Sequence, residues 1–109
     1  PDTVRRYVRS HVEAVHRLKT DRASGIKVLA KYVRGISDRE LLEKSYDRAV
    51  TDETLPRKQY PTLEGIRAIL EGLAEQEPKA KTAKPEEFVD MRFIGELDQS
   101  GYIDGLYRK

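Results

Sequence analysis

At 109 residues the chain is at most one domain, and with 38% hydrophobic and 37% charged residues it can bury only a small core. It contains no cysteine, which excludes disulfide bonds and thiolate metal sites, and no apolar run of the roughly 18 residues that a membrane span needs, so we expect no membrane insertion. The formal net charge is +2, but it is uneven, because residues 1–39 are +6 and the remainder is −4.

The first predicted element is a basic amphipathic helix at the N-terminus. Its apolar residues recur at the spacing of one helical face, and His11 falls on the same stripe, where we expect it to be partly buried. Asp2 or Thr3 is the expected cap at its start. The apolar stripe consists of Val4, Tyr7, Val8, Val12, Val15 and Leu18.

Two further helices are predicted before residue 51. Asp21 is the expected cap of the second, which ends at Gly35, where glycine can take the left-handed conformation that closes helices. Its apolar residues are Ile26, Leu29, Ala30 and Val33. The segment SDRE predicts a capping box of Ser37 and Glu40, from which the third helix follows. The residues expected to face the core there are Leu41, Leu42, Ser45, Tyr46, Ala49 and Val50.

A proline-flanked loop separates this part from a fourth helix. Pro56 and Pro61 predict extended structure over residues 52–61, because a residue that precedes proline avoids the helical region. Thr62 is the expected cap of the fourth helix. Its apolar stripe consists of Leu63, Ile66, Ile69, Leu70 and Leu73. The polar, lysine-rich residues 75–85 predict a surface connector.

The last part of the chain predicts a fifth helix and a short terminal turn. Pro85 suits the first position of a helical turn, after which Phe88 and Val89 are expected to point inward. Asp90 is the expected cap of the fifth helix, and Gly101 is a stop signal. The apolar residues of the helix and the turn are Met91, Phe93, Ile94 and Leu97, then Tyr102, Ile103, Leu106 and Tyr107. The predicted fold is therefore all-α, with about five amphipathic helices plus a terminal turn in a single helical segment, 1–109.

No residue pattern predicts catalysis. His11 and His16 are five residues apart and point about 140° away from each other on a helix, and no third ligand has a suitable spacing for a metal. Ser10 does not face His11, and the glycines lack the spacing of a phosphate-binding loop. We therefore expect neither an enzyme nor a cofactor.

Three segments of the chain together resemble a known family. They are RASGIKVLAKYVRGISDRELLEKSYD, LPRKQYPTLEGIRAILEGLAE and KPEEFVDMRFIGELDQSGYIDGLY. Their order and motifs are similar to the C-terminal portion of periplasmic solute-binding proteins of ABC importers, in the branch for nitrate, sulfonates, taurine and thiamine-pyrimidine precursors. The resemblance covers essentially the whole chain, but only about the last third of a typical family member.

This resemblance implies a fragment of a two-lobed α/β periplasmic binding protein of type II, with a small solute and an ABC permease as its partners and the periplasm as its location. The preceding lobes would supply the sheets and most of the ligand cleft. Apolar stripes without those sheets predict that the isolated chain self-associates. The N-terminus lacks the apolar core of a signal peptide, and Pro1 in place of Met predicts a processed or trimmed chain.

Tyr46, Arg57 and Tyr60 are the candidate ligand-binding residues, because tyrosine and arginine pair readily with anions and two of the three lie on the proline-flanked loop. The alternative is that Tyr46 packs in the core and that the other two are ordinary surface residues. The alternative function is a small helical interaction or regulatory domain that uses the basic face of the first helix on nucleic acid. The preferred interpretation includes no nucleic acid, since the third helix is acidic at its start and offers little to a groove.

Overall fold

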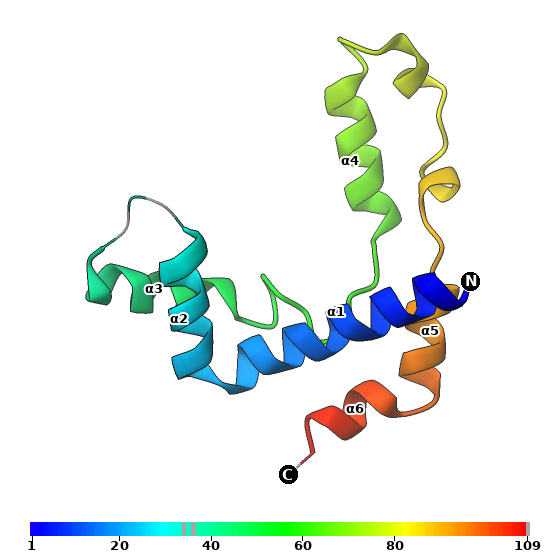
Figure 1. Cartoon of the computed structure of the whole chain (residues 1–109). Helices are drawn as coiled ribbons and strands as arrows, with labels where there is room; N and C mark the ends of the chain where they lie inside the picture. The colour runs from blue at the N-terminus through cyan, green and yellow to red at the C-terminus, as the bar shows by residue number, and fades with distance from the viewer. Residues whose placement is uncertain (34, 36, 109) are drawn as a thin grey trace.

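The computed structural model of the chain describes residues 1–33, 35 and 37–108, and its regular structure over these residues is entirely helical (Figure 1). The elements are α1 (Asp2–Thr20), α2 (Arg22–Tyr32), α3 (Arg39–Ala49), α4 (Leu63–Leu73), the 3-10 turns η1 (Pro78–Lys81) and η2 (Pro85–Phe88), α5 (Arg92–Gln99) and α6 (Tyr102–Leu106). The all-α prediction is confirmed. The expected terminal turn is a sixth short helix.

The long helix α1 carries a separate group of helices at each of its ends (Figure 1). α5 and α6 pack against α1, and Val12, Ile94 and Ile103 form a buried cluster where the three helices meet. Val12 and Ile103 are fully buried, because apolar faces from all three helices meet there. This cluster is the packing that holds the C-terminal helices on α1.

A second buried cluster lies between α2 and α3, at the far end of α1. Ile26, Leu42 and Tyr46 form its centre, and Leu18 at the end of α1 packs against it. Gly25 lets the two helices approach closely, because a Cβ at this position would lie 2.3 Å from Cε2 of Tyr46. The predicted inward faces are confirmed at the centre of this contact, where Leu29 and Val50 also pack on the cluster. They are wrong for Ala30, Val33, Leu41 and Ala49, which are exposed, because α3 packs on no helix other than α2 in the described part of the chain.

Residues 62–90 form an arm that projects away from α1 (Figure 1). α4 packs on η1 and η2, and on no other helix in the described part of the chain. Leu70, Ala80 and Pro85 are buried inside the arm. The outer face of α4 is open, and Ile69 is 59% exposed. Phe88 is 57% exposed, so the prediction that it points inward is wrong, because among the described residues η2 packs on α4 alone and this contact leaves the side chain open.

The molecule is elongated for its length. Its radius of gyration is 17.0 Å and its principal extents are 45 × 38 × 24 Å, whereas a compact chain of this length has a radius of about 13 Å. Many large apolar side chains are consequently open to solvent. They are Val4, Tyr7, Val28, Tyr32, Val33, Leu41, Tyr60, Leu63, Ile69, Leu73 and Phe88.

Two of the expected helix caps are confirmed and two are corrected. The backbone N–H of Ser24 donates to Asp21 (3.1 Å), and that of Gly65 donates to Thr62 (3.0 Å), as predicted. The cap of α3 is Asp38 and not Ser37, because the carboxylate accepts from two backbone N–H groups of the first turn. α1 already begins at Asp2, so neither Asp2 nor Thr3 caps it and Pro1 occupies the cap position.

The other helix ends differ from the predictions by a few residues. α2 ends at Tyr32, because Val33 takes an extended conformation, and Gly35 lies beyond the end with a φ of +86°. The cap position of α5 is Met91, one residue after the predicted Asp90. Asp90 nevertheless accepts a hydrogen bond from the backbone N–H of Arg92 (3.1 Å), the first residue of the helix. Gly101 separates α5 from α6 with a φ of +80°, which confirms the predicted stop.

Candidate binding loop and groove

A groove of about 420 Å³ lies between α1, the loop of residues 50–62 and the start of α5. Its volume falls in the range of small-molecule sites. The residues that give it its chemical character are Tyr7, His11, Pro56, Tyr60, Asp90 and Ile94. Aromatic rings and aliphatic side chains from three separate segments therefore line one open surface.

His11 is exposed, so the prediction that it is partly buried is wrong. The reason is that α5 and α6 cover α1 around Val12 and leave the beginning of the apolar stripe open. Tyr7, one turn earlier, is 73% exposed. These two uncovered side chains form the α1 wall of the groove.

Tyr60 lines the groove, and its hydroxyl group is hydrogen-bonded to a residue of α5 that does not line it. The hydroxyl donates to Oδ2 of Asp98 on α5 (2.6 Å), and Nζ of Lys58 lies 2.8 Å from the other carboxylate oxygen. The hydrogen bond to Asp98 raises the pKa of Tyr60, and the Lys58 ammonium lowers the pKa of Asp98. Tyr60 is thus fixed as a neutral phenol.

Arg57 is on the same loop, but its guanidinium is used elsewhere. It lies 4.4 Å from the centre of the Tyr107 ring, and its Nε is 3.4 Å from Oδ1 of Asp52. His16 of α1 meets the same tyrosine edge-on at 4.8 Å. Burial raises the pKa of Tyr107, whose hydroxyl group has no hydrogen-bond partner among the described residues. Arg57 therefore ties the loop to the end of α6 and does not line the groove.

Tyr46 is not part of the groove. It is 3% exposed in the cluster between α2 and α3, and its hydroxyl group donates to the carbonyl oxygen of Leu18. Burial raises the pKa of this phenol. The structure thus places Tyr46 in the core and, of the three candidate residues, only Tyr60 on the groove wall.

Sequence reasoning missed the residue that anchors the loop, Lys19 of α1. Its side chain is 7% exposed, and its Nζ donates to the carbonyl oxygens of Val50 (3.0 Å) and Leu55 (2.6 Å). The same ammonium lies 2.6 Å from Oδ1 of Asp52 and is the largest cause of the lowered pKa of that carboxyl. The signal was present, because Lys19 stands seven residues after Val12 and so falls on the apolar stripe.

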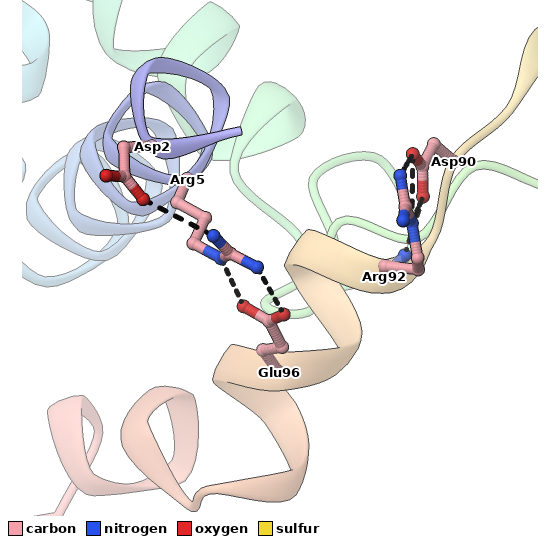
Figure 2. Close-up of polar contacts among 5 residues, drawn as sticks. All are labelled: Asp2, Arg5, Asp90, Arg92 and Glu96. Atoms are coloured by element: carbon pink, nitrogen blue, oxygen red, sulfur yellow. Dashed lines mark hydrogen bonds and ion pairs between the residues drawn. The ribbon is translucent and has the colours of Figure 1, made fainter.

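One ion pair ties α5 to α1, and another lies at the start of α5 beside the groove (Figure 2). Arg5 of α1 binds Glu96 through two bonds of 3.0 and 3.3 Å, and it also reaches Asp2 at 3.4 Å. The pKa of Asp90 is lowered to about 2, mainly by the hydrogen bond from the Arg92 guanidinium and, to a smaller extent, by the bond from the Arg92 backbone N–H. The carboxylate at this rim of the groove is therefore ionised, and its charge is already satisfied.

A larger hollow than this groove, of about 580 Å³, lies next to α2 and α3. Its charged lining includes Arg17 and Arg39, which pair with Asp21 (3.2 Å) and Glu43 (3.3 Å) respectively. It contains none of the three candidate residues and no aromatic side chain. We therefore take the groove beside Tyr60 as the candidate site.

Among the described residues, no cluster of three or more His, Cys, Asp or Glu side chains is arranged to hold a metal ion. Within the same residues, no helix combines the length and the apolar character that crossing a bilayer requires. Comparison of the chain with protein-family models, curated proteins and solved structures finds no match. Function is therefore inferred from the sequence and the structure of the chain alone.

Proposed function

We propose that the chain is the C-terminal helical part of the solute-binding component of an ABC importer. The observation that carries the proposal is the elongated shape, in which apolar faces on α1, α2, α3 and α4 lie open. Helices that finish a lobe of a two-lobed protein place such faces on a sheet, and large open apolar faces are otherwise costly to leave in water. This shape therefore supports what the sequence resemblance implies, namely that the chain is one part of a larger binding protein.

The groove supports the same proposal at the level of the site. A solute-binding protein needs a rigid polar and aromatic surface that closes over its ligand, and it needs no reacting group. The loop that carries Tyr60 is tied to α1 through Lys19 and to α5 through Asp98. In this proposal Tyr60 contacts the solute and Arg57 stands beside the site, from which it can turn toward an anion.

The charges on α1 favour this function over nucleic-acid binding. Arg5 lies 3.0 Å from Glu96, Arg9 lies 3.2 Å from Glu13, and Lys19 is covered by the loop. Phosphate binding depends on cations that are free to replace the counterions of the nucleic acid. Much of the positive charge that suggested the alternative is already neutralised within the chain.

The test is calorimetry on the full-length gene product, with nitrate, taurine and an aminopyrimidine as probes of the three ligand classes. We expect one probe to bind, and we expect Arg57→Ala and Tyr60→Ala to weaken it by about tenfold, the effect of losing one good polar or ring contact. Arg67→Ala is the matched control, because Arg67 is exposed on the arm and does not line the groove.

Two results would contradict the proposal. One is a full-length protein that binds none of the three probes. The other is binding to DNA whose affinity falls steeply with salt concentration, which is the behaviour of a protein that neutralises phosphates. Unchanged affinity in Arg57→Ala would remove Arg57 from the site while leaving Tyr60 in it.

A further inference from the structure

Lys19 carries a largely enclosed cation, with a side chain that is 7% exposed, and the proposed binding function does not itself use it. Its stem is enclosed at the end of α1, and its ammonium faces three oxygens, which are two backbone carbonyls and one carboxylate. An ammonium has three protons to donate, so this set of partners satisfies it completely. Such a group is costly to bury unless its partners are in place, which ties its burial to the shape of the loop.

The three partners lie at successive points of one segment. Val50 is the residue that closes α3, and its carbonyl is one of those that a helix end leaves without a partner. Asp52 and Leu55 follow in the turns before Pro56. A single side chain from α1 therefore fixes both ends of residues 50–55.

The fixed segment leads directly to the candidate site residues. Asp52 contacts Arg57 (3.4 Å), and Arg57 in turn lies on the Tyr107 ring. Tyr60 follows three residues later and reaches Asp98. A continuous chain of polar contacts runs from Lys19 through the loop to the C-terminal helices.

We propose that Lys19 is a positioning residue that holds residues 50–57 in the shape that presents Tyr60 to the groove. Its effect on a bound solute is indirect, and that part of the inference rests on the proposed function. The effect on the loop does not, because it follows from the contacts alone. The two parts can therefore be tested separately.

The loop is tested by timed trypsin digestion of the full-length protein, with the rate at each site followed by mass spectrometry. Lys19→Met keeps an unbranched apolar stem but removes all three bonds. We expect cleavage after Arg57 and Lys58 to accelerate by at least about tenfold, because charge-assisted bonds that close the loop are lost. Lys19→Arg can still donate to the same oxygens and should restore most of the protection.

Cleavage after Arg67, in the arm, is the internal control. It should not change, because α4 packs on no other helix than η1 and η2 in the described chain. Equal cleavage rates at Arg57 and Lys58 in the wild type and Lys19→Met would overturn the proposal. A parallel rise at Arg67 would also overturn it, since Lys19 would then support the whole chain and not the loop.

The effect on the solute is measured by calorimetry with whichever of nitrate, taurine and the aminopyrimidine binds. Lys19→Met should weaken binding by about tenfold, in proportion to the loss of loop order, and Lys19→Arg should recover it. If none of the probes binds to the wild type, the proposed function fails, while the digestion still decides the role of Lys19. If a probe binds equally to both proteins, the positioning role is refuted.

Discussion

The hydroxyl group of Tyr46 donates to a carbonyl oxygen in the last turn of α1, at Leu18. The last carbonyls of a helix have no partner within the helix, so this bond supplies one from a different element. Because burial disfavours the charged form, the pKa of this phenol is raised above the ordinary 10.0, so the hydroxyl group keeps the proton that it donates. Tyr46 thus links the end of α1 to α3 through one buried polar contact.

Tyr46→Phe should lower the free energy of unfolding by about 1 kcal/mol, since it removes the bond and leaves the carbonyl unpaired. The raised pKa also sets a pH dependence. Its stabilising contribution is present below about pH 10 and is lost as the pH rises through the higher value in the folded state. Urea unfolding at about pH 8 and about pH 11 should therefore show a smaller loss in Tyr46→Phe than in the wild type. An equal loss in both proteins would contradict this assignment.

At the scale of elements, the contact between α2 and α3 depends on Gly25. A methyl group there would lie 2.3 Å from Cε2 and 3.0 Å from Cδ2 of Tyr46, and 3.2 Å from Cδ1 of Leu18. The ring cannot move aside easily, because it is buried and its hydroxyl group is bonded to α1. The two helices are therefore as close as glycine alone allows.

Gly25→Ala should destabilise the chain, because overpacking costs about 1–3 kcal/mol and outweighs the gain of about 1 kcal/mol in helix propensity. Gly72→Ala is the matched control, since nothing lies within 4 Å of its added Cβ. It should leave stability unchanged or raise it by up to about 1 kcal/mol. Melting followed by circular dichroism measures both, and a stabilised Gly25→Ala protein would refute the packing argument.

The helices themselves could be predicted from apolar spacing and cap residues, because both signals are local. Asp21 and Thr62 were found in this way. Asp38 was not, since Ser37 beside it fits the same pattern and only the backbone decides between them. The groove could not be predicted, because it joins α1, a loop and α5, which are far apart in sequence. Tyr60 was named from its place on the loop, whereas the role of Lys19 required knowing where that loop lies.

At the scale of the whole molecule, the arm offers an apolar face that no other helix covers in the described part of the chain. Ile69 and Leu73 lie on the outer side of α4, and Phe88 of η2 is also exposed. Faces of this kind tend to be buried by association when the chain is isolated. In the proposed function the same face belongs against the rest of the protein.

The isolated chain should therefore self-associate, with a sedimentation coefficient that rises with concentration. Ile69→Lys should reduce the association, because it places a charge in the centre of the open face. Ala68→Lys is the control, since this exposed residue points to a different side of α4. A wild-type chain that sediments as a monomer at every concentration would count against the prediction.

The ion pair between Arg5 and Glu96 joins the two ends of the chain, which are 91 residues apart. The contacts of α2 with α3, and of α4 with η1 and η2, link much closer neighbours in sequence. Closing a long loop costs more chain entropy than closing a short one, and distant contacts form slowly. The order of assembly follows: the helix pair and the arm can form early, and the cluster around Val12 forms when the C-terminal helices return to α1.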